Sequence, residues 1–145
     1  IRRPLGRPAI KAARASGVDP RRLVFELPEE LATTNLKEMK ELQALIHPLG
    51  FELAIENFGA GRDQAQLLSH VPVNYVKIDG ALMQGLANDR SLQEQVKGLV
   101  EHAKTAGATT IAERVEDANT MAVLWQLGVE YVQGYFVNTP EEVVM

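Results

Sequence analysis

The chain has 145 residues, which is the length of one ordinary domain or of part of a larger one. Its net charge of −4 and the lack of an evident basic face argue against a nucleic-acid partner, and the absence of cysteine excludes disulfides and thiolate metal sites. No apolar run approaches the roughly 18 residues that span a bilayer, and the first residues lack the apolar core of a signal peptide. We therefore expect a cytoplasmic protein without membrane insertion.

Segments rich in aromatic and β-branched residues alternate along the chain with segments of helical periodicity. A helix is expected before residue 21. The expected strands are residues 21–27, 51–57, 73–79, 109–116 and 129–136, and the expected helices between them are residues 35–47, 62–70, 91–107 and 117–128. This alternation predicts right-handed βαβ units and hence a parallel sheet of the α/β class.

The ends of the helices carry recognisable capping residues. Thr34, Ser91 and Asp117 are the expected N-caps, and Gly128 is expected to close the helix that Asp117 begins. Residues 139–140, Thr-Pro, are expected to start a final helix, because proline is favoured at the first helical position.

Five parallel strands are compatible with two architectures. They belong either to an open doubly wound sheet or to part of a (β/α)₈ barrel, since a complete barrel needs about 250 residues. In both architectures the carboxyl ends of the strands meet at one edge, where active sites are built.

Polar side chains stand at the carboxyl end of every expected strand. A single polar residue there carries little weight, because strands leave the core at that point. Five strands with polar ends favour a site, and carboxylates around one lysine indicate divalent-metal and phosphate chemistry. These residues are Glu26, Glu29, Glu56, Asn57, Lys77, Asp79, Glu113, Glu116 and Gln133.

Some other residues have a structural and a functional interpretation. Phe58, beside the glycine-containing loop, either closes the rim of the sheet or contacts a ligand. Trp125 lies on an apolar helix stripe with Met121 and Leu124, so core packing is expected. The three histidines are dispersed without metal-ligand spacing and are expected to be solvated or partly packed.

Five motifs, in order, resemble those of EAL domains, which bind and usually hydrolyse cyclic di-GMP. They are "FELPEE", "AIENFGAG", "VKIDG", "AERVE" and "QGYF" followed by Pro140, where the family has ExTE, DDFGxG, KID, AEGVE and QGYxxSRP. The resemblance implies a variant (β/α)₈ TIM-like barrel, of which this chain supplies about five βα units. The Glu-Ala-Leu motif is absent, so residues 1–145 are expected to be the C-terminal part of a single EAL domain.

The resemblance also implies roles for individual residues. Glu29 would anchor the loop that contains Gly59 and Gly61, and in active relatives Lys77 would contact the attacking water or phosphate and Glu113 would act as the base. The implied metal ligands of an active enzyme, with Mg²⁺ or Mn²⁺, are Glu26, Glu56 and Glu113. The expected ligand-binding residues are Glu26, Glu56, Asn57, Phe58, Lys77, Asp79, Glu113, Arg114, Glu116, Gln133 and Gly134.

Departures from the family motifs indicate a degenerate member. Glu56 and Asn57 replace paired aspartates, and this change is expected to empty at least one metal position, because Mg²⁺ demands near-ideal octahedral geometry. Arg114 stands where the family has glycine. We therefore expect no required metal cofactor, with the side chains of Lys77, Arg62 and Arg114 offsetting the ligand's charge.

Three functions remain open at this point. The first is a non-hydrolytic cyclic di-GMP receptor, similar to FimX-type regulators of type IV pilus assembly and twitching motility. That subgroup implies a PilZ-domain partner and a location at the cell pole, and a dimer is also compatible with the sequence. The second is an active metal-dependent phosphodiesterase, and the third is a protein-interaction module that does not bind nucleotide.

Overall fold

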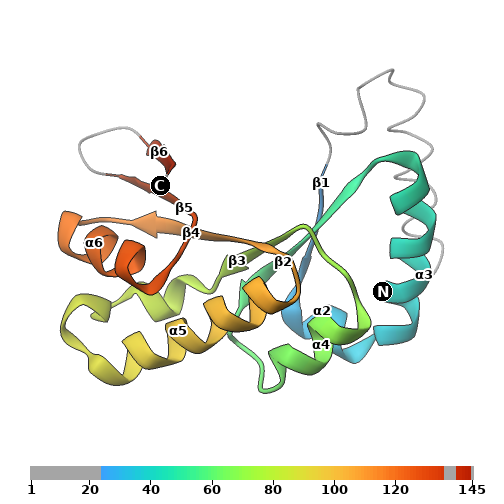
Figure 1. The fold of residues 1–145 in the computed structure, drawn as a ribbon, viewed down its shortest axis with the longest axis horizontal. Helices are drawn as coiled ribbons and strands as arrows, with labels where there is room; N and C mark the ends of the chain where they lie inside the picture. The colour runs from blue at the N-terminus through green and yellow to red at the C-terminus, as the bar shows by residue number, and fades with distance from the viewer. Residues whose placement is uncertain (1–23, 136–139, 145) are drawn as a thin grey trace.

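The computed structural model describes residues 24–135 and 140–144 (Figure 1). The expected helix before residue 21, the first three residues of the first expected strand and residues 136–139 lie outside the described residues. The strands are β1 (Val24–Pro28), β2 (Glu52–Phe58), β3 (Tyr75–Ile78), β4 (Thr109–Val115), β5 (Tyr131–Tyr135) and β6 (Pro140–Val144). The α-helices are α2 (Glu29–Thr34), α3 (Leu36–Ile46), α4 (Gln64–His70), α5 (Arg90–Thr105) and α6 (Ala118–Leu127), and short 3₁₀ turns are η2 (His47–Leu49), η3 (Gly80–Met83) and η4 (Leu86–Asn88).

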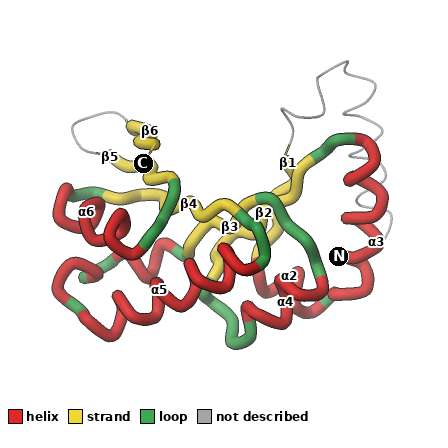
Figure 2. The backbone as a smooth tube through the Cα atoms, viewed as in Figure 1, coloured by secondary structure: helices red, strands yellow, loops and turns green. Residues whose placement is uncertain are grey.

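The described strands form one sheet in chain order, from β1 to β6 (Figure 2). Neighbouring strands from β1 to β5 are parallel, which confirms the predicted α/β class and its five parallel strands. The order and direction of these strands agree with the parallel β/α architecture that the resemblance implies. Residues 140–144 pair antiparallel with β5, so the final helix expected from Pro140 is wrong.

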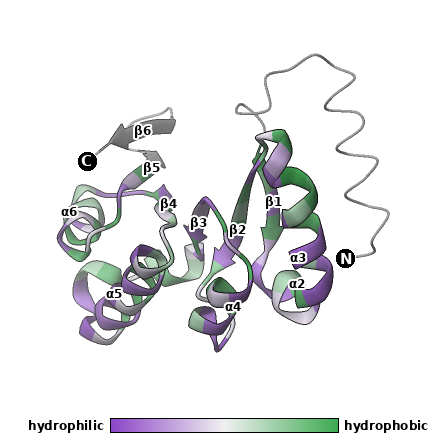
Figure 3. Ribbon diagram, turned by 45° about the vertical axis from the view of Figure 1, so that its right-hand side comes forward, coloured by the Kyte–Doolittle hydropathy of each residue, from purple (hydrophilic) through white to green (hydrophobic). Residues whose placement is uncertain are grey.

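The helices lie on one side of the strands, as Figures 1 and 3 show from two directions. Alternate strand residues pack under this helical layer and are fully buried, because a strand points successive side chains to opposite faces. They include Leu53, Ile55, Val76, Ala112 and Val132. Apart from the buried Ala54, the residues between them remain partly or fully exposed on the opposite face of the sheet, which therefore presents the polar strand-end residues.

The starts of the helices differ in part from the prediction. Asp117 caps α6 as expected, because its carboxylate accepts the Thr120 N–H at 2.7 Å. Asp89 rather than Ser91 caps α5 and accepts the Leu92 N–H at 3.2 Å. Thr34 is not a cap either, since its hydroxyl donates to a backbone carbonyl one turn earlier.

Helix α6 ends at Gly128, which has a φ of 94° and closes the helix as predicted. The expectation for Trp125 on this helix is wrong, because the side chain is 40% exposed whereas Leu124 is completely buried. Adjacent helical positions differ in direction by about 100°, so Trp125 lies at the margin of the buried stripe. None of the helices in residues 24–135 is long and apolar enough to cross a bilayer.

Candidate functional site

A pocket of about 660 Å³ opens at the carboxyl ends of β2, β3 and β4. Ligand sites in proteins typically have volumes of about 300–1,000 Å³. Seven of the predicted ligand-binding residues line this pocket: Glu56, Asn57, Lys77, Asp79, Glu113, Arg114 and Glu116. The parallel register brings these residues together although they lie up to sixty positions apart in the sequence.

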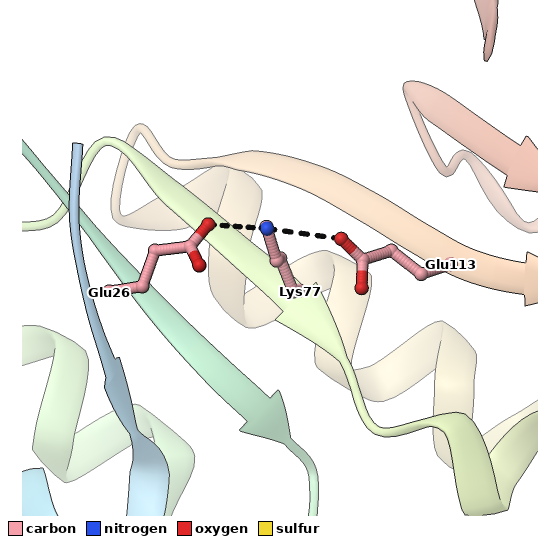
Figure 4. A network of polar contacts seen from close by, with 3 residues as sticks. All are labelled: Glu26, Lys77 and Glu113. Atoms are coloured by element: carbon pink, nitrogen blue, oxygen red, sulfur yellow. Dashed lines mark ion pairs between the residues drawn. The ribbon is translucent and has the colours of Figure 1, made fainter. Parts of the chain in front are cut away.

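Lys77 is the centre of the ion pairs at this site (Figure 4). From β3 its ammonium contacts the Glu26 carboxylate on β1 and lies 3.0 Å from the Glu113 carboxylate on β4. All three side chains are partly exposed, at 21% to 37%. One lysine therefore joins three strands of the sheet and offsets part of the negative charge at the mouth of the pocket.

The charges at this mouth shift one another's protonation equilibria. The hydrogen bond from Lys77 is the main influence on Glu26 and lowers its pKa below the ordinary value. Burial alone would lower the pKa of Lys77, but hydrogen bonds to Glu26 and Glu113 outweigh it and raise that pKa. Hydrogen bonding with Glu26, followed by burial, raises the pKa of Glu56. Glu26 and Glu56 therefore resist carrying a negative charge at the same time.

Two similar irregularities of the sheet shape the rim. In β2 the pairing with β3 shifts between Ile55 and Phe58, so that two residues of β2, residues 56–57, lie opposite a single residue of β3, Lys77. In β4 the pairing with β5 shifts between Ala112 and Val115, so that residues 113–114 lie opposite a single residue of β5, Gln133. Each is a bulge, in which two residues oppose one. Each bulge places a glutamate and its successor together at the pocket.

The second residue of each bulge has a left-handed backbone. The φ angle is 53° at Asn57 and 60° at Arg114, and these are the two non-glycine residues with positive φ in the described chain. Asparagine adopts this conformation readily, whereas for a residue such as arginine it costs about 1–2 kcal/mol. The bulge also explains why glycine would suit position 114.

The bulge in β2 decides the role of Phe58. Strict alternation would send Phe58 to the same face as Glu56, but the extra residue turns it to the helical face. The side chain is completely buried in the core and does not line the pocket. Of the two interpretations of Phe58, the structure supports closing of the rim, and its place among the ligand-binding residues is corrected accordingly.

Glu29 holds the loop that follows β2. Its side chain is only 2% exposed and accepts the N–H of Gly59 at 3.0 Å, the N–H of Gly61, and the side-chain amide of Gln64 at 3.4 Å. A Cβ at Gly61 would lie 2.1 Å from the Glu29 carboxylate, so the close approach requires glycine. These contacts are those of a loop anchor.

Other residues predicted for the site lie on β5 and in the loop after β2. Gln133 is exposed on β5, and Gly134 pairs with Val115 across the sheet. The cation Arg62 is exposed and is absent from the lining. The three histidines are exposed, as expected of solvated side chains: His47, His70 and His102.

Sequence reasoning missed one wall of the pocket. This wall lies next to the predicted Asp79, in and after η3, and consists of Gly80, Ala81, Met83, Gln84 and Gly85. Asp117 and Thr120 contribute at the start of α6. Asp117 was recognised as a cap, and its position directly after the fourth strand was a signal for a second role. Residues 80–85 lack chemistry-bearing side chains apart from Gln84, so only the topology reveals them.

The arrangement of the carboxylates does not fit a bound metal ion. Among the described residues no group of three or more histidines, aspartates and glutamates is arranged to hold one. The expected ligands Glu26 and Glu113 point to the ammonium of Lys77, and hydrogen bonding couples Glu26 to Glu56. Oxygen ligands of Mg²⁺ must instead converge at about 2.1 Å on one centre.

The EAL domain family matches residues 7–140 of the chain. The structure is similar to the FimX EAL domain of Pseudomonas aeruginosa bound to c-di-GMP, with 35% identity and a TM-score of 0.83 over 94% of this chain and 56% of that one. The FimX EAL domain of Xanthomonas citri in complex with c-diGMP gives 31% identity and a TM-score of 0.81 over 94% and 54% of the two chains.

Curated relatives show the same family. The cyclic di-GMP phosphodiesterase PdeB of Shewanella oneidensis is 33% identical over 81% of this chain and 14% of its own length. The probable cyclic di-GMP phosphodiesterase PdeA of Escherichia coli is 29% identical over 86% of this chain and 17% of its own. The chain thus spans about half of the similar EAL domain structures and less than a fifth of these relatives.

Proposed function

Because the chain belongs to the EAL domain family, we propose that it forms part of a receptor that binds cyclic di-GMP without hydrolysing it. The observation that carries this proposal is the position of Lys77, whose ammonium lies between Glu26 and Glu113. These two carboxylates would have to share metal ions if the site were to activate water. In the receptor, the lysine supplies a fixed positive charge instead.

The pocket suits a ligand with phosphate groups only if cations offset its acidic lining. Five carboxylates and two cationic side chains, Lys77 and Arg114, line it. The pKa of Glu56 is raised, chiefly by hydrogen bonding with Glu26, because two neighbouring carboxylates disfavour each other's negative charge. Asn57 adds a neutral amide that can donate hydrogen bonds to phosphate or base oxygens.

The second candidate function is a metal-dependent phosphodiesterase. Two observations favour it: the names of the curated relatives, and the presence of Glu26, Lys77 and Glu113 at the strand ends. In that case Mg²⁺ or Mn²⁺ would displace the Lys77 contacts when it binds. The third candidate, an interaction module without nucleotide binding, would leave the pocket without a ligand.

The proposed receptor acts through a protein partner. By resemblance to FimX-type proteins we propose a PilZ-domain protein, a role in type IV pilus biogenesis and twitching motility, and a location at the cell pole. We also propose that the chain is the C-terminal part of a single EAL domain. Formation of a dimer stays a prediction.

Calorimetry on the full-length protein tests these functions. Cyclic di-GMP is titrated in Mg²⁺ and in EDTA, and the mixture is then analysed for the linear dinucleotide. The receptor binds with the same affinity in both buffers and leaves the ligand intact. Metal-dependent conversion to the linear product would establish the enzyme, and the absence of binding heat, checked by equilibrium dialysis, would establish the interaction module. A Lys77→Met variant should lose affinity in both buffers if the lysine supplies the fixed charge.

A further inference from the structure

Arg114 occupies a backbone position that favours glycine. It is the second residue of the β4 bulge and has a φ of 60°. Strained conformations of this kind persist where the surrounding structure holds them, and they concentrate at functional sites. An arginine at this position therefore needs a reason beyond the fold, because glycine would satisfy the backbone better.

The position of Arg114 supplies such a reason. The residue lines the pocket beside Glu113 and Glu116, and its side chain is exposed. The ion pairs found among the described residues join Lys77 to Glu26 and Glu113, so Arg114 makes none with a described residue. Two cations thus line the pocket, but only Lys77 contacts carboxylates of the site.

From this geometry we infer that Arg114 binds a phosphodiester of the ligand. The inference rests on the proposed function, since the ligand is the cyclic dinucleotide. A guanidinium presents two parallel N–H donors to two phosphate oxygens, and such charge-assisted bonds are stronger than neutral ones. Lys77 holds the carboxylates together, while Arg114 is available to the ligand.

The bulge fixes the direction of this contact. Because residues 113–114 share one partner position on β5, Arg114 follows Glu113 to the pocket face instead of pointing under the helices. In a regular strand the residue after Glu113 would face the core, where an unpaired guanidinium is not tolerated. The bulge and its left-handed backbone are therefore what bring Arg114 to the pocket lining.

Replacement of Arg114 by glycine should lower the ligand affinity without lowering the stability of the protein. Arg114→Gly removes the guanidinium and relieves the backbone. The variant should bind cyclic di-GMP on the order of ten- to a hundredfold more weakly. In the absence of ligand its Tm should be equal to that of the unaltered protein or about 2 °C higher. Arg114→Asn, which also accepts a left-handed backbone, should show the same loss of affinity.

The test compares these variants in the full-length protein by calorimetry and thermal unfolding. Arg114→Lys keeps the positive charge but lacks the two parallel N–H donors of the guanidinium, and it should retain part of the affinity. Arg90→Ala is the control, because Arg90 is exposed at the start of α5 and does not line the pocket; its affinity should stay within about twofold of the unaltered protein.

The outcomes separate this inference from the proposed function. If the unaltered protein does not bind cyclic di-GMP, the proposed function fails and the inference fails with it. If the unaltered protein binds and Arg114→Gly binds equally well, only the inference is overturned. A loss of affinity as large in Arg90→Ala as in Arg114→Gly would also overturn it, because the effect would then be one of net charge.

Discussion

Replacing Phe58 tests the bulge in β2 most directly. The side chain is completely buried, and its backbone carbonyl accepts the N–H of Asp79 at 2.9 Å. Truncation of a fully buried phenylalanine to alanine costs about 3–5 kcal/mol, because apolar contacts are lost and a cavity remains. For a domain of this size the Tm should fall by roughly 10 °C. Phe58→Leu, which keeps most of the apolar volume, should cost only about 1 kcal/mol.

Urea unfolding followed by circular dichroism, together with calorimetric titration of cyclic di-GMP, measures both effects on the full-length protein. Trp125→Ala is the control for loss of an aromatic ring, and it should cost less than Phe58→Ala because the indole is already 40% exposed. The reasoning is refuted if Phe58→Leu leaves the free energy of unfolding unchanged but weakens nucleotide binding tenfold. That result would place the ring in the pocket rather than in the core.

Three further predictions concern the helices and the carboxylates. Asp89→Ala should cost about 1 kcal/mol of stability in urea unfolding, whereas Ser91→Ala should be close to neutral, and equal costs would contradict the assignment of the cap. Gly98→Ala in α5 should raise the stability by about 0.5–1 kcal/mol, since a Cβ there meets no atom within 4 Å; a loss of stability in the same assay would show a hidden clash. Glu56→Gln should raise the Tm at pH 7, because the charge of Glu56 is unfavourable beside Glu26. Since the pKa of Glu56 is raised in the folded state, the gain in Tm from Glu56→Gln should shrink as the pH falls from above the folded pKa to the ordinary value of 4.5. A gain in Tm that is independent of pH would contradict an unfavourable interaction between the charges of Glu56 and Glu26.

The sequence predicts the order and type of most elements because local patterns decide them. Period-two alternation identifies β2 and β3, and three- and four-residue steps identify α3 and α5. The strand β6 is different, because the Thr-Pro-Glu-Glu segment fits a helix start equally well. Only the pairing of residues 140–144 with β5 makes this segment a strand, and local propensity does not contain that information.

The caps of the helices and the edge of the buried helix face also depend on the tertiary structure and not on local sequence patterns alone. Asp89 and Ser91 are both good capping residues and lie two positions apart, so the residue that caps depends on where the preceding turn ends. Trp125 and Leu124 are neighbours on an apolar stripe, but only Leu124 reaches the core. Periodicity identifies the apolar stripe of the helix, but the tertiary packing determines how many of its residues are buried.

The candidate site was predictable to the extent that it follows from the parallel register. Polar residues at successive strand ends meet at one edge, which is why Lys77 and Glu113 were found together. The bulges were not predictable, because they are features of the pairing between strands. They decide that Phe58 is buried and that Arg114 faces the pocket.

The two bulges also explain how this fold can change its chemistry without changing its shape. Each bulge presents a glutamate and then a residue with positive φ, and the backbone limits the second residue sterically rather than by charge. A neutral amide at Asn57 and a cation at Arg114 therefore alter the electrostatics of the pocket, while the core residues next to them stay buried. Substitutions at these two positions have a small cost in strain and a large effect on which charges a ligand meets.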